Sequence, residues 1–213
     1  MIIELNNVLP FPLAEYPHGP ESVWSGKTQV NSSDKTLLNA SSGKGKSTFA
    51  STLYGLRKDY EGTVSIDGSD IKSFELNDWI ELRKTKLSAV FQDLQLFGDL
   101  TALENLQLKN NLTNHRSEER LIEMLEILGI GDKQNQTCKT MSLGQQQRVA
   151  IIRSLLQPFE LLILDEPFSH LDEKNSEIAL KLINEETDAN NAGYVLTTLG
   201  SRHGFDFDVE LKL

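Results

Sequence analysis

One stretch decides how this chain folds. It reads Lys35-Thr36-Leu37-Leu38-Asn39-Ala40-Ser41-Ser42-Gly43-Lys44-Gly45-Lys46-Ser47-Thr48. Its first four residues make a short apolar strand, and apolar residues recur at helical spacing after it, at Phe49, Leu53 and Leu56. A strand, a glycine-containing loop and a helix in this order are typical of a phosphate-binding loop, although Ala40 stands where that pattern usually has glycine.

The loop carries the residue types that binding a nucleotide phosphate requires. Gly43 and Gly45 let successive backbone N–H groups converge on phosphate oxygens without obstruction by a Cβ atom. Lys46 can reach the β- and γ-phosphates, and the Ser47 hydroxyl can ligate Mg²⁺ at the start of the helix. The expected nucleotide ligands are Ser42, Gly43, Lys44, Gly45, Lys46, Ser47 and Thr48. The alternative interpretation is a Gly- and Ser-rich surface loop that happens to contain lysines.

Two carboxylates follow the most apolar strand candidate of the chain. The run 161–164, Leu-Leu-Ile-Leu, precedes Asp165 and Glu166. Ligands bind at the carboxyl ends of strands in open α/β sheets, and successive residues there point in different directions. We therefore expect Asp165 to hold Mg²⁺, directly or through water, and Glu166 to orient or deprotonate a water that attacks the γ-phosphate. The alternative is a polar strand end that faces solvent.

Strands and helices alternate over most of the sequence, which predicts an α/β fold with a mainly parallel sheet. Two early strands without a helix between them, at 1–8 and about 22–30, predict an antiparallel flank. A helical block begins at about residue 101 and runs to about 129, has Ser117 as a predicted N-cap, and reads as an insertion. The other expected elements are strands at 61–68, 87–91, 161–164 and 194–198 and helices at 143–156 and 173–184.

The composition narrows the function classes. The 213 residues include 21 Lys and Arg against 31 Asp and Glu, a net charge of −10, which opposes general nucleic-acid binding. The one cysteine, Cys138, excludes an internal disulfide framework and a multi-cysteine zinc site. No apolar stretch approaches the roughly 18 to 20 residues that span a bilayer, and the N-terminal residues are not expected to form a secretory signal. We expect a cytoplasmic chain whose membrane contact is peripheral.

Three further segments resemble motifs of one family. Residues 141–148, Met-Ser-Leu-Gly-Gln-Gln-Gln-Arg, resemble the signature sequence of ABC-type ATPases. Residues 91–105, which begin Phe-Gln-Asp, resemble the Q-loop region, and residues 169–172, Ser-His-Leu-Asp, resemble the D-loop. Together with the phosphate loop and the carboxylate pair, these segments make the chain similar to the ATP-binding subunit of an ABC transporter, from residue 1 to about 200.

The resemblance implies a P-loop NTPase core of the ABC-type ATPase kind, with an antiparallel β flank and an inserted helical subdomain. It implies a single domain over 1–213, made of a RecA-like core (1–91 and 157–213) and a helical subdomain (about 92–156). It also implies a head-to-tail dimer, with a second copy or with another ATP-binding subunit. Each ATP would lie between the phosphate loop of one chain and the signature of the other, and integral membrane permease subunits would dock on the helical subdomain.

The resemblance also assigns roles to single residues. Ser142, Gly144 and Gln145 would bind the ATP held by the partner chain, because the helix that they open directs its N-terminal dipole at the γ-phosphate. Gln92 would sense the γ-phosphate through Mg²⁺ or water and is the second catalytic residue beside Glu166. The expected metal ligands are Ser47, Gln92 and Asp165, and the expected bound ligands are ATP and Mg²⁺.

An aromatic side chain is expected to stack on the adenine ring. Tyr16 is the best candidate, and Phe11 and Trp24 are its rivals. Packing in the core is the alternative role for each of the three.

The sequence departs from the family pattern at two positions. Leu143 stands where the signature has a second glycine, and its side chain either crowds the partner's phosphate site or points away into the helical lobe. Leu199 stands where the family has a histidine that contacts the γ-phosphate, and leucine neither donates nor accepts a hydrogen bond. His203 either replaces that histidine or is an exposed loop residue, which is the favoured reading. We expect slow hydrolysis, with ATP binding and dimerisation preserved.

The leading hypothesis is an ATPase that hydrolyses ATP to ADP and phosphate to drive transport through a membrane permease. The alternatives are a regulatory switch that binds ATP and hardly hydrolyses it, and an ABC-type ATPase without a role in transport. Leu143 and Leu199 favour the switch, whereas Gln92, Asp165 and Glu166 favour the enzyme. A soluble kinase is disfavoured because it has no use for the signature and the D-loop. The transported substrate and the direction of transport do not follow from the sequence.

Overall fold

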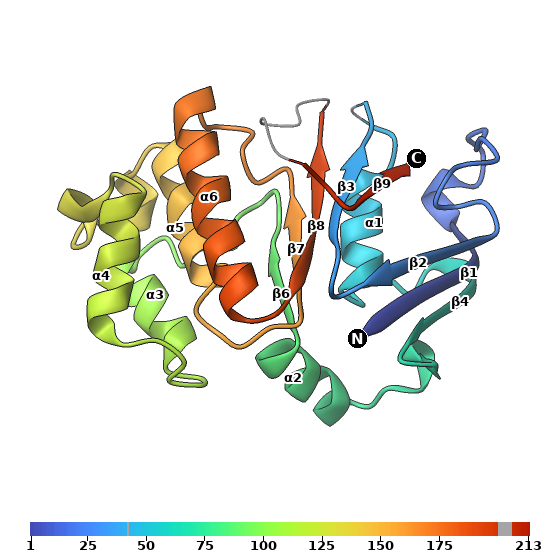
Figure 1. Ribbon diagram of the computed structural model, residues 1–213, viewed down its shortest axis with the longest axis horizontal. Coiled ribbons are helices and arrows are strands. Elements are labelled where there is room, and N and C mark those ends of the chain that lie inside the picture. The colour runs from blue at the N-terminus through green and yellow to red at the C-terminus, as the bar shows by residue number, and fades with distance from the viewer. Residues whose placement is uncertain (42, 200–205) are drawn as a thin grey trace.

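The computed structural model describes residues 1–41, 43–199 and 206–213 (Figure 1). Its strands are β1 (Ile2–Pro10), β2 (Lys27–Asn31), β3 (Lys35–Asn39), β4 (Tyr60–Ile66), β5 (Ser69–Asp70), β6 (Leu87–Val90), β7 (Leu161–Asp165), β8 (Gly193–Thr198) and β9 (Val209–Lys212). Its α-helices are α1 (Lys46–Leu53), α2 (Leu76–Thr85), α3 (Ala102–Asn110), α4 (Glu118–Ile127), α5 (Leu143–Ser154) and α6 (Glu173–Ala189). Short 3-10 turns are η1 (Phe11–Leu13), η2 (Ile71–Ser73), η3 (Gly131–Lys133) and η4 (Cys138–Thr140).

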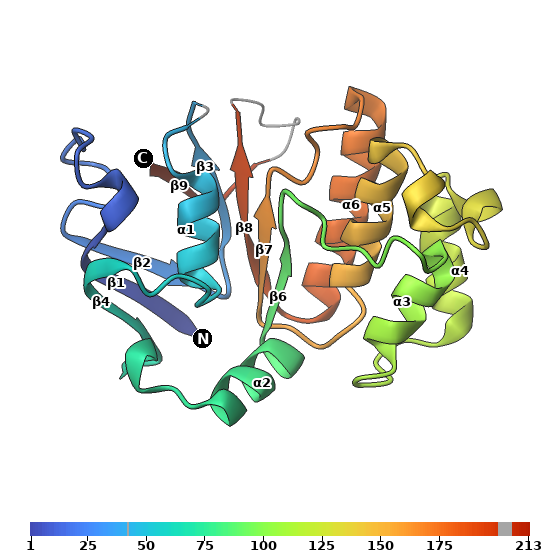
Figure 2. The same ribbon diagram turned by 180° about the vertical axis from the view of Figure 1, so that it is seen from behind.

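The larger sheet is parallel and has the strand order β6-β7-β8-β3-β9. Its interior strand β7 is buried over its whole length, and its side chains alternate between two hydrophobic clusters. Leu162 and Leu164 pack on the side of α5 and α6, whereas Leu161 and Ile163 pack on the side of α1. Helices thus cover both faces of this sheet (Figures 1 and 2), which explains why β7 reads as an unbroken apolar run.

The smaller sheet is antiparallel, with the order β2-β1-β4-β5, and forms the predicted flank. It lies on the far side of α1 from the parallel sheet (Figures 1 and 2). Phe49 of α1 contacts Trp24 edge to face, with ring centroids 5.8 Å apart, in the cluster that this sheet shares with α1. The predicted strand at 22–30 is shorter than expected, because pairing with β1 begins only at Lys27.

The predicted helical block consists of two helices, α3 and α4. Ser117 is the N-cap of α4, as predicted, and its Oγ accepts a hydrogen bond from the backbone N–H of Arg120. The connection between the helices is fixed by the buried Asn110, whose side chain pairs with both the N–H and the carbonyl of Arg116 at 3.0 and 2.8 Å. None of the helices in the described part of the chain has the length and apolar character to cross a membrane.

Two further features of the fold differ from the sequence prediction. The helix expected through Leu56 ends at Leu53, and Leu56 is 51% exposed. Gly55 follows with a φ of +72°, and a Cβ atom there would lie 1.8 Å from the Trp79 ring, so the chain turns sharply at this glycine. Trp79 belongs to α2, a helix that the sequence analysis did not predict.

Candidate nucleotide-binding site

The loop between β3 and α1 has a backbone conformation that its glycines permit. Gly43 and Gly45 have φ values of +76° and +100°, in the left-handed region that residues with a Cβ atom avoid. A Cβ atom on Gly45 would also lie 2.7 Å from Cδ1 of Leu13. Gly45 is the N-cap of α1, so the loop ends where unpaired backbone N–H groups attract an anion. Ser42, a predicted ligand, lies outside the described residues.

Lys46 is buried at the first position of α1, with 4% of its surface exposed. Its Nζ donates to the carbonyl oxygens of Ala40 at 2.9 Å and Ser41 at 3.0 Å, and lies 3.1 Å from Oε1 of Glu166. A buried ammonium needs such partners to remain charged. The ammonium therefore lies between the loop and the end of β7, beside a cavity that Lys46 lines together with Ser47, Thr48 and the loop glycines.

The two carboxylates at the end of β7 have different surroundings. Asp165 is 2% exposed, and Thr197 donates to its Oδ1 at 2.9 Å. Burial raises the pKa of Asp165, and hydrogen bonds with Ser47 and Thr197 oppose this rise. Glu166 leaves the strand with a φ of +48°, and its Oε1 lies 3.1 Å from the Nζ of Lys46. The two adjacent acids thus have different partners: Asp165 bonds to the hydroxyls of Ser47 and Thr197, and Glu166 pairs with Lys46.

Gln92 follows β6 and lines two cavities. One of them is also lined by the phosphate loop and Glu166, and the other by Ser47 and Asp165. The structure therefore brings the three predicted metal ligands, Ser47, Gln92 and Asp165, to the wall of one cavity. A hydroxyl, an amide and a carboxylate are oxygen donors of the kind that Mg²⁺ prefers.

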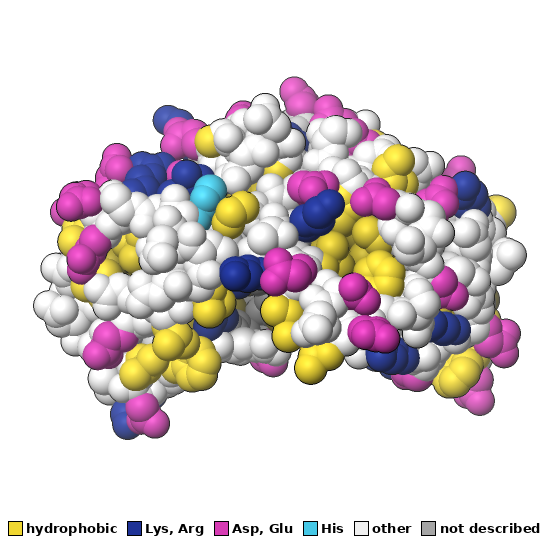
Figure 3. Space-filling model, turned by 90° about the horizontal axis from the view of Figure 1, so that it is seen from below, with side chains coloured by type: hydrophobic (Ala, Val, Ile, Leu, Met, Phe, Trp, Pro, Cys, Tyr) yellow, Lys and Arg dark blue, Asp and Glu magenta, His cyan; other side chains and the backbone are white. Residues whose placement is uncertain are grey.

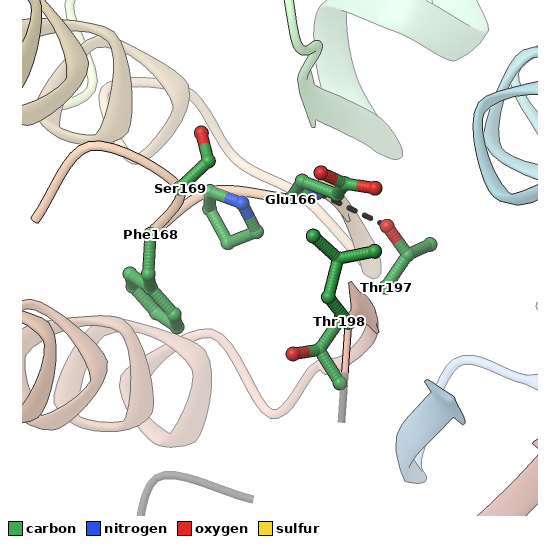
Figure 4. Close-up of a pocket in the computed structure, with 7 residues that line it drawn as sticks. Glu166, Phe168, Ser169, Thr197 and Thr198 are labelled. Atoms are coloured by element: carbon green, nitrogen blue, oxygen red, sulfur yellow. Dashed lines mark hydrogen bonds between the residues drawn. The ribbon is translucent and has the colours of Figure 1, made fainter. Parts of the chain in front are cut away.

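A third cavity lies beside Glu166, at the ends of β7 and β8 (Figure 4). The backbone N–H of Glu166 donates to the Thr197 Oγ1 at 3.0 Å, which ties the two strand ends together. Leu199 lines this cavity and is 59% exposed, so an apolar side chain stands at the position where the resemblance implies a histidine. The considered substitute, His203, lies outside the described residues.

The signature residues begin α5 and lie apart from the phosphate loop. Ser142 and Gln145 form a capping box, with the side chain of each accepting from the backbone N–H of the other at 3.3 and 2.9 Å. A Cβ atom on Gly144 would lie 2.6 Å from the carbonyl oxygen of His170, so this glycine permits the D-loop to approach. Leu143 is 55% exposed instead of packing into the helical lobe. Residues 142–145 do not line the described cavities at the phosphate loop.

The three candidates for adenine stacking differ in accessibility. Trp24 is 4% exposed and packs on Phe49 in the core, so its ring faces are not free for a base. Tyr16 and Phe11 are each 58% exposed. The Tyr16 N–H donates to the carbonyl of Leu13 at 3.1 Å, and Leu13 lines the cavity of the phosphate loop. The segment that carries Tyr16 is therefore anchored at this cavity.

Sequence reasoning missed two side chains of α5 that connect to the site, the partly buried Arg153 and the buried Gln147. Arg153 donates to the carbonyls of Leu94 and Gln95 at 2.8 and 2.7 Å, where two consecutive residues have φ values of +56° and +48°. Gln147 donates to the carbonyl of Glu166 at 3.1 Å. Their position on the signature helix is a signal that sequence reasoning could have used, but their contacts require the folded chain.

Known proteins are similar to this chain in sequence and in fold. A family model described as ABC transporter matches residues 26–169. The lipoprotein-releasing system ATP-binding protein LolD of Buchnera aphidicola subsp. Schizaphis graminum (strain Sg) is 34% identical over 173 residues, which are 80% of this chain and 76% of LolD.

Two solved structures of one protein resemble the whole chain. The dimeric structure of MJ0796, described as a bacterial ABC transporter cassette, has a TM-score of 0.80 and 26% identity and covers 99% of this chain and 94% of its own. The dimeric structure of MJ0796 in a post-hydrolysis state, bound to ADP and Pi, has a TM-score of 0.75 and 27% identity and covers 92% and 87%. The family match spans the phosphate loop, the signature and the carboxylate pair, and the chain therefore belongs to the ABC transporter family, as one of its ATP-binding subunits.

Proposed function

We propose that two copies of this ATP-hydrolysing subunit hold each ATP between the phosphate loop of one copy and the signature of the other. One observation carries this proposal: the loop, Lys46 and Glu166 surround a cavity to which the chain's own Ser142 contributes nothing. The N-terminus of α5 is exposed, and its helix dipole favours an anion. In this arrangement that anion is the nucleotide bound to a second chain. A partner that is another ATP-binding subunit would supply the same two surfaces.

The residues at the phosphate loop fit Mg²⁺ together with a triphosphate. Asp165 is buried, and burial raises its pKa, so its carboxylate gains from a nearby divalent cation, and Ser47 and Gln92 offer two further oxygen donors. When bound, Mg²⁺ would neutralise negative charge on the phosphate oxygens. We assign these three residues to the metal, and the glycines, Lys44, Lys46 and Thr48 of the loop to the phosphates.

Glu166 is proposed to accept the proton of the attacking water. In the structure its Oε1 is paired with the Lys46 ammonium at 3.1 Å. A γ-phosphate offers that ammonium another anionic partner, and a Glu166 carboxylate released from the pair is free to act as a general base. Lys46 would thus link ATP binding to the release of the general base Glu166.

An equal mixture of two inactive variants tests the proposed dimer. Ser142→Arg should abolish phosphate release, because the added bulk and charge disrupt the site of the partner, while the chain's own loop still binds ATP. Lys46→Ala should also be inactive, because its own phosphate loop no longer binds ATP, although its signature is intact. In an equal mixture, half of the dimers are mixed and each carries one intact site, so about a quarter of the wild-type rate should return. Inactivity of the mixture, with both variants folded, would contradict the head-to-tail arrangement.

Leu199→His should raise kcat at least about tenfold, since a histidine beside Glu166 supplies a hydrogen-bond donor that leucine lacks. Leu199 is exposed in the cavity next to Glu166, so the substitution buries no polar group. Steady-state phosphate release at saturating Mg-ATP measures the effect, with Leu76→His as control, because Leu76 is an exposed leucine outside the described cavities of the site. Fast hydrolysis by the wild type, with no gain in the variant, would refute the claim that Leu199 slows hydrolysis. A switch that hardly hydrolyses ATP is not favoured, because a similar cassette was solved after hydrolysis.

A groove between α2 and α3 is the proposed docking site for the membrane permease, on the cytoplasmic face of the membrane. It encloses about 490 Å³ and lies where the proposed core (1–91 and 157–213) meets the proposed helical subdomain (92–156). Figure 3 shows hydrophobic side chains gathered beside a hollow on the face that carries these two helices. The exposed apolar residues in its wall are Leu56, Phe97, Leu108 and Leu112.

The charges of this groove indicate its occupant. Arg83, Lys109 and Arg153 line it, and none of the described residues in its wall is acidic. Burial lowers the pKa of Lys109, and the nearby Arg153 lowers it further, so an acidic partner would relieve this cluster. We therefore propose a short amphipathic helix of the permease with an apolar face and acidic side chains. Because Gln95 lines the same groove three residues after Gln92, a docked helix would contact the loop that reaches the metal site.

Leu108→Asp combined with Leu112→Asp should lower permease-stimulated hydrolysis at least about tenfold, because two exposed apolar anchors of the groove become charged. Basal hydrolysis by the isolated chain should not change, since neither residue reaches the nucleotide cavities. Phosphate release is measured with a permease encoded beside this chain, purified in detergent. Ile127→Asp on α4, away from the groove, serves as control. Full stimulation of the double variant would place the permease elsewhere.

A further inference from the structure

Gln147 is a buried polar residue in the second turn of α5, with 1% of its surface exposed. Its Nε2 donates to the carbonyl of Glu166 at 3.1 Å and lies 3.3 Å from the Oγ of Ser169. Its Oε1 accepts from the backbone N–H of His170 at 2.9 Å. One side chain therefore uses its donors and its acceptor on the segment that follows β7.

The backbone that Gln147 contacts is constrained at the proposed general base. Glu166 has a φ of +48°, a left-handed conformation that a residue with a side chain adopts only when its surroundings enforce it. Thr197 accepts from the Glu166 N–H at 3.0 Å, and Gln147 holds the carbonyl on the other side of the same residue. Both peptide groups of Glu166 are thus fixed by side chains from other elements.

The same helix carries the signature at its start. Ser142 caps α5, and one turn before Gln147 the backbone of Gly144 lies so close to His170 that a Cβ atom would be 2.6 Å from its carbonyl oxygen. A displacement of the first two turns of α5 must therefore move residues 166–170 or break their hydrogen bonds. Helices displace as rigid units, which makes this contact a mechanical link.

We propose that Gln147 is a positioning residue for hydrolysis: it couples the signature helix to the backbone of Glu166, so that the base is aligned when α5 meets the partner's ATP. This inference rests on the proposed function, in which Glu166 is the base and Ser142 binds the nucleotide of the other chain. In this role Gln147 acts through the backbone of Glu166.

Two variants of the full chain separate positioning from packing. Gln147→Met keeps the volume and removes all hydrogen bonds, and Gln147→Glu keeps the acceptor for His170 but loses the donor for Glu166. Both should lower kcat at least tenfold, with the Kd of ATP within twofold of wild type. The control is Gln157→Met, because Gln157 is equally buried at 1% exposure and bonds to the backbone of Leu87, away from the site. Its kcat should stay near wild type.

A double-mutant cycle gives the decisive readout. If Gln147 acts through Glu166, then Gln147→Met should have less than a twofold effect on the residual rate of Glu166→Gln, whereas a general loss of structure would lower that rate further. A wild-type kcat in either folded Gln147 variant, or full additivity in the cycle, would overturn the inference. High activity of Glu166→Gln alone would instead refute the proposed base, so the two failures are distinguishable.

Discussion

Glu166→Gln is expected to lower kcat for ATP hydrolysis by at least about 100-fold, because the amide cannot accept the proton of the attacking water. ATP affinity should be preserved or increased, since the Lys46–Glu166 ion pair no longer competes with the phosphate for the ammonium. Phosphate release measures the first effect. The second is measured as ATP that stays with the protein through gel filtration, which wild type loses as ADP.

A matched carboxylate controls for the charge change. Glu177→Gln replaces an exposed glutamate on α6, outside the described cavities at the site, and should hydrolyse ATP at the wild-type rate. A kcat for Glu166→Gln within threefold of wild type would show that the proton is taken elsewhere. The buried neighbour Asp165 would then be the next carboxylate to examine.

Lys46→Met is expected to weaken ATP binding by at least about 100-fold, or about 2.8 kcal/mol. The methionine fills the volume of the lysine stem, so the loss reports on the ammonium, which is 4% exposed and aimed at the site. Charge-assisted hydrogen bonds to phosphate in a site shielded from water are strong enough for this effect. Fluorescence titration with an ATP analogue measures the affinity.

Lys58→Met is the control for the lysine, because Lys58 is exposed after α1 and lies outside the phosphate-loop cavity. It should bind ATP like wild type. Thermal unfolding of both variants without nucleotide confirms that they are folded. A Kd for Lys46→Met within threefold of wild type would remove the lysine from the nucleotide site.

The central strands of the fold were predictable because their signals are local. The run at 161–164 has no polar residue and must be buried on both faces, as β7 is. By contrast, α2 escaped prediction because its buried side chains are only Trp79 and Leu82, while Leu76 and Ile80 are exposed at 75% and 49%. The buried stripe of α2 is therefore only two residues long, and the start signal of this helix, the capping box of Glu75 and Asp78, was overlooked.

The site shows the same division between local and distant information. Glycine spacing and the placement of acids after a strand are local, and they led to the loop, Asp165 and Glu166. Gln147 meets Glu166 across 19 positions of sequence, and Arg153 meets Gln95 across 58, contacts that depend on how α5 packs. Trp24 is an aromatic residue near the loop, but its ring is buried and packs on Phe49 in the core, so it is not available to a ligand.

The claim that ATP joins two chains is tested most directly by the mass of the Glu166→Gln protein in solution. Light scattering with saturating Mg-ATP should give about twice the chain mass of 23.9 kDa, and removal of the nucleotide should return the single-chain value. The same protein carrying Ser142→Arg should stay at the single-chain mass with ATP bound. A mass that remains at 23.9 kDa for Glu166→Gln in saturating Mg-ATP would contradict the account.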